Sequence, residues 1–461
     1  MKLSKNEIQE ILNQALVTGA DFGELFFENT LSSVISLKNK EVTNISIGNV
    51  SGVGVRLLKG SDEVYGYTND VTKASVLGLL EQLKASFNDV AGKVYPLGNA
   101  LSFNNNIKKP FDQVPTNEKT RKLLEINTII KDSNDLIVQA ITNLIETKQD
   151  VLIANTEGIY QNDERVYSRV VLGAVAKREE QMEQGYESQG RFMGFEIFDE
   201  IDFKAMANEV AESAIKQLDA KDIKAGVMPV VIHNGFGGVI FHEACGHPLE
   251  ASAIAKGLSP FVGKVGEKVA SEIVSAYDNG NVPGAWGRLN FDDEGHPTQN
   301  NLLIENGILK GYLIDKRNGR TMNTNSTGSS RRQSYKYSPT SRMNSTFIAN
   351  GKDKYEDIIR DTKYGLFAKK LGGGTVNPAT GEFNFAVSEG YMIEDGKLTD
   401  AVKGAMLIGN GKDILFEIDR VADNLEFGQG MCGAASGSIP VDVGQPTIRL
   451  KKITVGGLGN E

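Results

Sequence analysis

The chain has no apolar run approaching the roughly 20 residues that a membrane-spanning helix requires. Its first residues, MKLSKNEIQEILNQAL, alternate charged and apolar side chains at helical spacing and lack the apolar core of a signal peptide. We therefore expect a soluble, cytoplasmic protein without a membrane partner.

An excess of positive charge is also missing. Lys and Arg together number 50 against 59 Asp and Glu, which gives a formal net charge of -9 and a pI near 5.3. A protein that binds nucleic acid needs a basic face that displaces counterions from the phosphates. The charge balance therefore argues against nucleic acid as a partner.

Cysteine and histidine are both scarce. The 461 residues contain two cysteines, Cys245 and Cys432, and four histidines. A single disulfide in a large intracellular protein is less expected than free thiols or a metal ligand. The surroundings of the two cysteines must decide between these roles.

The length and the 40% content of hydrophobic residues indicate a folded protein with more than one core. Helical periodicity is expected over residues 4–20, 72–87, 118–131 and 203–220, with strands between these segments. From about residue 227 the chain consists mainly of short apolar runs separated by Gly, Asn and Asp, which favour strands. We predict an α+β fold, with an α/β domain over residues 1–223 and a mainly β domain over residues 224–461.

The segment HEACGH, residues 242–247, carries two of the four histidines on either side of a glutamate. Chance would give this pattern in only about one or two sequences per thousand of this composition. Five residues of regular α-helix place two side chains about 140° apart, too far round the helix to share one ion. We therefore expect a π-bulge at residues 244–246, which Gly246 makes less costly and which brings His247 under His242.

A catalytic zinc ion normally takes three protein ligands and leaves one position for water. Beside His242 and His247 we expect Cys432 as the third ligand, because a thiolate is a good soft ligand and neighbouring glycines let the backbone approach an ion. Cys245, inside the motif, is the rival thiol. Glu243 is placed to act as the general base toward the water that the metal activates.

Other polar clusters have less specific interpretations. The acids Asp292, Asp293 and Glu294 are expected to be a solvated turn, and a calcium or magnesium site is the alternative. Three arginines, Arg331, Arg332 and Arg342, are either exposed loop charges or donors to a peptide substrate. His233 and His296 are expected to be structural.

The sequence from residue 225 to the end resembles the TldD/PmbA family of metallopeptidases. Segments that carry the resemblance are GGVIFHEACGHPLEA, NFDDEGHPTQNNLLIENGILKGYLIDK, SRMNSTFI, GGGTVNPATGEFNFAVSEGYMIEDGKLTDAVKGAMLIGNG and MCGAASGSIPVDVGQPTIRL. They occur in the family's order, whereas the first half of the chain matches only weakly. The motif places the chain with the TldD branch, although Pro248 stands where glycine is more common.

This resemblance implies one zinc ion per chain, held by His242, His247 and Cys432, with Glu243 as the catalytic glutamate. It implies a C-terminal domain of mostly antiparallel strands with a metal-binding helix, and an N-terminal domain that serves substrate enclosure and dimerisation. It also implies a homodimer, or a heterodimer with a related chain, that takes unfolded or extended peptides by strand addition.

We therefore predict a zinc-dependent peptidase that uses metal-activated water. The alternatives are a non-catalytic peptide-binding or regulatory subunit of such a complex, against which the intact motif argues, and a regulator of a DNA-topology enzyme, against which the acidity argues.

Overall fold

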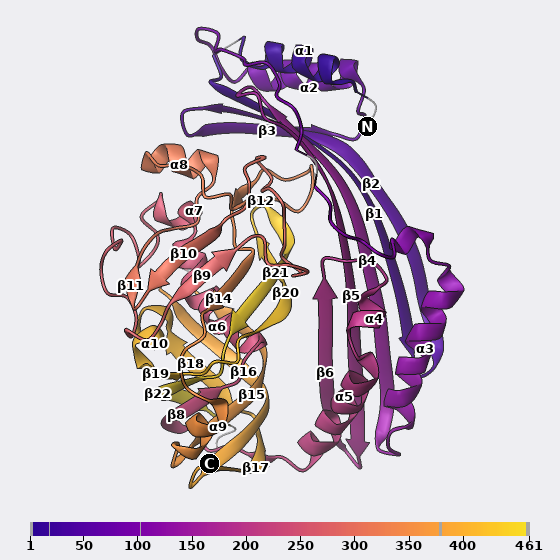
Figure 1. Cartoon of the computed structure of the whole chain (residues 1–461), viewed down its shortest axis with the longest axis vertical. Coiled ribbons are helices and arrows are strands. Elements are labelled where there is room, and N and C mark those ends of the chain that lie inside the picture. The colour runs from indigo at the N-terminus through magenta and orange to yellow at the C-terminus, as the bar shows by residue number, and fades with distance from the viewer. Residues whose placement is uncertain (1–2, 18, 102, 378–379, 458–461) are drawn as a thin grey trace.

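The computed structural model describes residues 3–17, 19–101, 103–377 and 380–457. The fold is α+β, as expected, and combines an N-terminal six-stranded sheet with a second six-stranded sheet and an eight-stranded sheet in the C-terminal half. In Figure 1 the N-terminal sheet curves along one side of the C-terminal half. None of the described helices has both the length and the apolar character needed to cross a membrane.

The N-terminal sheet is antiparallel throughout, with the strand order β3-β2-β1-β4-β5-β6. In chain order the elements of this half are α1 (Lys5–Ala15), β1 (Phe22–Lys38), β2 (Glu41–Lys59), β3 (Asp62–Thr68), α2 (Lys73–Lys84), η1 (Phe111–Gln113), α3 (Thr116–Asp132), β4 (Ile137–Asn155), β5 (Tyr160–Arg178), β6 (Gln181–Arg191), α4 (Ile197–Glu200) and α5 (Phe203–Leu218).

Helix α1 begins where the sequence predicts, because Ser4 and Glu7 form a capping box that satisfies free backbone N–H groups at the helix start. Helices α1 and α2 cover one end of the sheet and α3 and α5 cover the other, and each pair encloses a separate apolar cluster. The four helices expected in this half are all present.

The C-terminal half contains a six-stranded sheet of order β11-β10-β9-β14-β21-β20 and a larger sheet of order β15-β8-β22-β18-β16-β17-β7. Strand β19 pairs with β22, and the pairing of β15 with β16 closes part of the larger sheet into a ring. Most pairs are antiparallel, whereas β14 with β21, β8 with β15, and β7 with β17 are parallel.

The strands of this half are β7 (Lys221–Asp222), β8 (Gly226–Ile232), β9 (Ala276–Asn279), β10 (Asn300–Glu305), β11 (Ile308–Leu309), β12 (Ser330–Arg331), β13 (Thr340–Ser341), β14 (Ser345–Ile348), β15 (Tyr364–Val376), β16 (Glu382–Glu394), β17 (Lys397–Lys403), β18 (Met406–Asn410), β19 (Ile418–Val421), β20 (Glu426–Ala434), β21 (Gly437–Gln445) and β22 (Ile448–Gly456). Its helical elements are η2 (Phe236–Gly238), α6 (Val239–Phe241), η3 (His242–Gly246), η4 (His247–Leu249), α7 (Ala251–Ile254), α8 (Lys316–Met322), α9 (Tyr355–Arg360) and α10 (Gly411–Glu417).

Buried ion pairs join the two halves. Arg56 of β2 contacts Glu294, and Arg165 of β5 donates to Asp293 at 2.8 Å. Asp292 also lies in the interior, where it accepts backbone N–H groups of its own turn and of Ser330. The expectation of a solvated acidic turn is therefore wrong, because the partners that neutralise it come from strands more than 120 positions away.

The three arginines near residue 335 are buried as well. Arg332 pairs with Glu24 of β1, and Arg331 donates to the carbonyl oxygen of Met343 at 2.7 Å. Arg342 is fully buried beside β20. Of the two interpretations of these arginines, the one that makes them exposed loop charges is wrong.

Candidate metal centre

The two motif histidines lie on an irregular helical segment that follows strand β8. The segment runs from η2 through α6 into η3, a π-helix over His242–Gly246. The backbone N–H of His247 donates to the carbonyl oxygen of His242, which is the bond from residue i to i+5 that defines this wider turn. The π-turn predicted from the five-residue spacing is confirmed.

Gly246 has a different role from the one expected. Its φ of -60° and ψ of -54° are ordinary helical values that any residue adopts. A Cβ atom at this position would lie 2.2 Å from the sulfur atom of Met343, so glycine here makes room for the Met343 side chain and does not serve a backbone distortion.

Cys432 lies on β20, the edge strand that forms a hairpin with β21. Glycines bring this hairpin against the helical segment. A Cβ on Gly238 would lie 2.6 Å from the backbone of Gly444, and a Cβ on Gly428 would lie 2.7 Å from Cα of Phe236. We expected the glycines near Cys432 to let the backbone approach an ion. At one of them, Gly428, the missing side chain instead lets the main chain of Phe236 come close.

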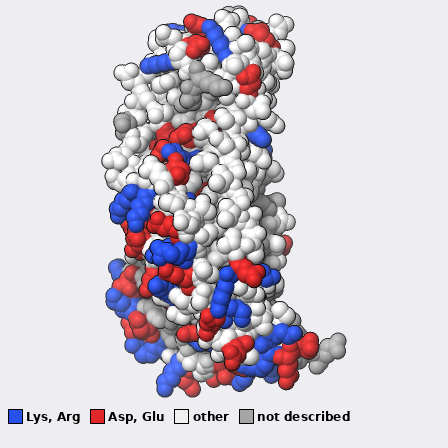
Figure 2. Space-filling model, turned by 90° about the vertical axis from the view of Figure 1, so that its right-hand side faces the viewer, with Lys and Arg blue, Asp and Glu red and all other residues white. Residues whose placement is uncertain are grey.

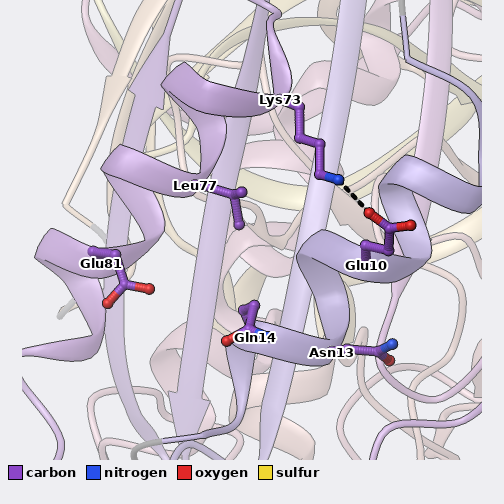
Figure 3. Close-up of a pocket in the computed structure, with 6 residues that line it drawn as sticks. All are labelled: Glu10, Asn13, Gln14, Lys73, Leu77 and Glu81. Carbon is purple, nitrogen blue, oxygen red and sulfur yellow. Dashed lines mark hydrogen bonds and ion pairs between the residues drawn. The ribbon is translucent and has the colours of Figure 1, made fainter.

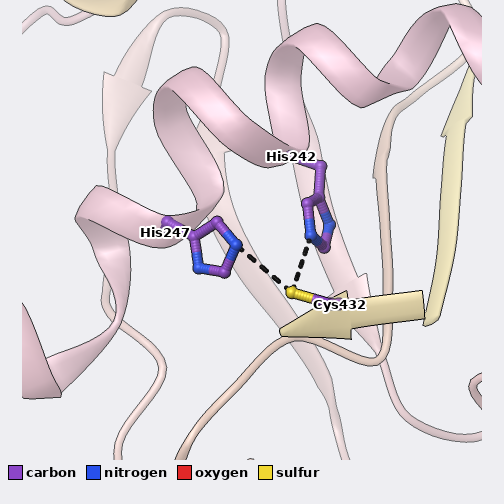
Figure 4. Close-up of side chains that lie close together, drawn as sticks. All are labelled: His242, His247 and Cys432. Carbon is purple, nitrogen blue, oxygen red and sulfur yellow. Dashed lines mark hydrogen bonds between the residues drawn. The ribbon is translucent and has the colours of Figure 1, made fainter. Parts of the chain in front are cut away.

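Figure 4 shows the side chains of His242, His247 and Cys432 converging on one point. The Cys432 sulfur atom lies 3.4 Å from Nε2 of His242 and 3.2 Å from Nε2 of His247. One possible ligand atom from each residue lies within 4.8 Å of the other two. His242 and Cys432 are buried, and the His247 side chain is 16% exposed.

These separations fit a zinc ion. Bonds of about 2.0–2.1 Å to nitrogen and about 2.3 Å to sulfur, at a tetrahedral angle, imply N···S separations of about 3.6 Å. The observed values are 3.4 and 3.2 Å, so small shifts would accommodate the ion. Two imidazoles and one thiolate are also a donor set that suits zinc.

The surroundings favour the ionised form of the thiol. Burial alone would raise the pKa of Cys432, but hydrogen bonds from His242 and His247 and their charge outweigh it and lower the pKa to about 4. Burial would lower the pKa of His247, whereas the charge of Glu250 and contacts with Cys432 and Glu250 raise it well above its ordinary value. These shifts favour the thiolate, the form that binds metal.

Glu243 lies beside the cluster and is not one of its three members. Its Oε2 atom is 3.7 Å from Nε2 of His247, and its side chain is 30% exposed. A carboxylate so placed can reach both the ligand atoms and a molecule that enters from solvent. The structure thus brings all four predicted site residues together.

Cys245 points away from this cluster. Its sulfur atom is buried and lies 3.5 Å from the carbonyl oxygen of Gly411, and burial raises the pKa of the thiol. His233 packs against Tyr355 and Phe367, in a different part of the fold. His296 lies in the buried acidic turn at the junction of the two halves.

Sequence reasoning missed Glu250, whose Oε2 atom lies 3.2 Å from Nδ1 of His247. The signal available was an acidic residue three positions after the second histidine, a spacing that brings side chains together along a helical turn.

A surface hollow of about 430 Å³ lies between α1 and α2 (Figure 3), where Lys73 pairs with Glu10. The six residues that line this hollow are Glu10, Asn13, Gln14, Lys73, Leu77 and Glu81. None of them belongs to the His/His/Cys cluster, and we assign no chemistry to this hollow.

Comparisons with known proteins match three successive segments of the chain. Family models match residues 23–87 (PmbA/TldA metallopeptidase domain 1), 109–218 (central domain) and 225–457 (C-terminal domain). The metalloprotease TldD homolog of Buchnera aphidicola subsp. Schizaphis graminum is 34% identical over 99% of this chain and 98% of that protein. The metalloprotease TldD homolog of Haemophilus influenzae is 34% identical, with 95% of this chain and 93% of that protein covered.

The crystal structure of TldE from Thermococcus kodakarensis has a similar fold, with a TM-score of 0.78. It covers 98% of this chain and all of that one, at 19% sequence identity. This likeness extends the agreement in fold to both halves of the chain.

Proposed function

The chain belongs to the PmbA/TldA metallopeptidase family, and on that premise we propose that it is a zinc-dependent peptidase acting on unfolded or extended peptides. The observation that carries this proposal is the convergence of two imidazole nitrogens and a low-pKa thiolate, with a partly exposed carboxylate beside them.

In this proposal His242, His247 and Cys432 hold one zinc ion. Zinc bound there would supply Lewis-acid chemistry, polarising the scissile carbonyl group and lowering the pKa of a water molecule to about 7. Glu243 accepts a proton from the attacking water and later returns it to the leaving amine. Its carboxylate suits this role because it lies next to the ligand atoms and remains open to solvent.

Metal analysis and peptide cleavage of the purified chain and of Glu243→Gln test this assignment. We expect about one zinc per chain in both proteins, with hydrolysis reduced roughly 10²- to 10⁴-fold in the variant. Glu272→Gln, at an exposed position, is the control for loss of a carboxylate. A metal-free wild-type protein whose cleavage resists chelators would overturn the zinc mechanism, and full activity of Glu243→Gln would overturn its role as the base.

The two cysteines provide a matched test of the third ligand. Cys432→Ser should bind zinc much more weakly, because an alcohol is a poor zinc ligand compared with a thiolate. Cys245→Ser should retain wild-type zinc affinity, since Cys245 faces Gly411. Equal zinc content in both variants would remove Cys432 from the site.

For the organisation of the chain, we propose that residues 224–461 form the peptidase domain and that residues 1–223 help to enclose the substrate and to form a dimer. All four proposed site residues lie in the first of these segments. An unstructured peptide should therefore be cleaved faster than the same sequence held in a folded domain, and equal rates would argue against this substrate class.

The outer part of β2 supports the dimer proposal. Strand β3 pairs with β2 from Val53 onward, so the preceding edge faces no strand in the described part of the chain. Its exposed apolar side chains include Val42, Ile45, Ile47 and Val50. Figure 2 views the side along which β2 runs, and the middle of that surface carries few charged side chains.

A second copy, or a related chain, would cover this edge. Ile47→Glu should shift the protein toward monomer in sedimentation experiments. An unchanged molar mass would remove this edge from the interface.

The alternative, a non-catalytic binding or regulatory subunit, is not favoured, because the similar proteins over nearly the full length are described as metalloproteases.

A further inference from the structure

Glu250 is a buried acid beside the metal centre, and its side chain does not cap the helix that follows it. It occupies the N-cap position of α7, yet it makes no side-chain cap hydrogen bond. Its carboxylate instead lies 3.2 Å from Nδ1 of His247, while Nε2 of the same ring faces Cys432. With Nδ1–H donated to this carboxylate, the imidazole would direct its Nε2 lone pair into the cluster once a metal ion replaces the Nε2 proton.

Arg342 holds the strand that carries the third ligand. Its guanidinium donates to the carbonyl oxygen of Cys432 at 2.5 Å, and to the Oγ atom of Ser436 and the carbonyl oxygen of Gly437 at 2.9 and 3.0 Å. These contacts span the β20–β21 turn, so one fully buried side chain fixes Cys432 relative to the hairpin end. Only a guanidinium has donors in this rigid fork.

Glu250 and Arg342 also meet each other. Oε1 of Glu250 lies 3.9 Å from Nε of Arg342, and neither atom has a hydrogen-bond partner within the described residues. A buried charge is costly unless an opposite charge balances it. Moving either side chain would therefore leave the other with less compensation.

We propose that Glu250 and Arg342 are coupled positioning residues of the metal centre, in which Glu250 orients His247 and Arg342 fixes the backbone of Cys432. This inference rests on the proposed metal site. The two histidines are therefore held differently. Nδ1 of His242 is buried with no partner among the described residues, whereas Nδ1 of His247 lies beside the Glu250 carboxylate.

Zinc affinity, measured on metal-stripped protein by competition with a chromophoric chelator, tests this proposal without a substrate. Loss of an outer partner of a metal-binding histidine typically weakens metal binding about 10- to 100-fold. We expect a loss of this size for Glu250→Ala and a smaller loss for Glu250→Gln, which keeps an acceptor near Nδ1. Arg342→Lys, which keeps the charge without the fork, should also weaken binding, and Glu272→Gln should match wild type.

Two further readouts separate positioning from general destabilisation. The unfolding midpoint of metal-free Glu250→Gln should fall only modestly, because Arg342 keeps its hydrogen bonds to the β20–β21 turn and the amide keeps an acceptor oxygen, although its zinc affinity falls. In the cobalt-substituted protein, the visible absorption bands should change in Glu250→Ala, because the orientation of one ligand changes.

If the two residues are coupled, Glu250→Gln combined with Arg342→Lys should lose less affinity than the product of the two single losses. A multiplicative loss would overturn the coupling, and wild-type affinity in both Glu250 variants would overturn the positioning role. A wild-type protein that binds no zinc would instead contradict the proposed function.

Discussion

Arg56 should be among the most sensitive positions for stability outside the metal centre. Its side chain is fully buried and faces three carboxylates, of which Glu24 and Glu294 are fully buried and Glu63 is 11% exposed. In Arg56→Met, Glu24 keeps its ion pair with Arg332. The uncompensated charge therefore falls mainly on Glu294, which retains the backbone N–H of Lys316.

Because one buried carboxylate loses its partner, the cost of breaking a single buried pair applies, which is about 3–5 kcal/mol. Urea unfolding at fixed metal content measures this free energy. Lys59→Met is the control, since Lys59 and Asp89 form an ion pair that is 43% and 54% exposed and that contributes about 1 kcal/mol or less.

Adding Glu294→Gln to Arg56→Met should recover part of the loss, because the orphaned charge is removed. A loss in Arg56→Met no larger than that in Lys59→Met would contradict the role of this buried charge, and so would a double variant in which Glu294→Gln adds its own full cost.

Three further predictions concern the metal centre and its surroundings. Gly246→Ala should destabilise the fold by roughly 1–3 kcal/mol through overpacking against Met343. The double variant with Met343→Ala should lose less stability than the sum of the two single losses, and strictly additive losses in unfolding experiments would contradict this contact. Free zinc at about 100 times its Kd should raise the unfolding free energy by about 2.7 kcal/mol, an effect that Cys432→Ser should largely abolish. Burial raises the pKa of Asp278, on β9, to about 6. Between about pH 4 and pH 6 the folded state therefore keeps a carboxyl proton that the unfolded state has released. Stability relative to Asp278→Asn should therefore fall as the pH rises from about 4 to about 6; a parallel pH dependence of the two proteins would contradict this.

The sequence predicted the features that depend on neighbouring residues. The capping box at Ser4 and the π-turn between His242 and His247 follow from spacing over three to five positions. The α+β fold class follows from periodicity. Cys432, 185 positions after His247, was identified through its residue type and a family resemblance.

Features that depend on distant partners were missed or misinterpreted. A run of acids at residues 292–294 resembles a solvated turn until Arg56 and Arg165 are brought to it by folding. The partners of Arg332 and Arg342 are equally remote in sequence, so their burial could not be inferred locally. Glycine has several possible roles, and Gly246 serves packing because of Met343, which lies nearly a hundred positions away.

The close approach of Gly238 to Gly444 has a consequence for metal selectivity. Main chain meets main chain there, so the distance between the helix and the hairpin cannot shrink and side chains cannot adjust it. The backbone therefore sets the smallest span that the ligands can close around an ion, whereas small outward shifts remain possible. Replacing these glycines with larger residues would widen the centre before any ligand is changed.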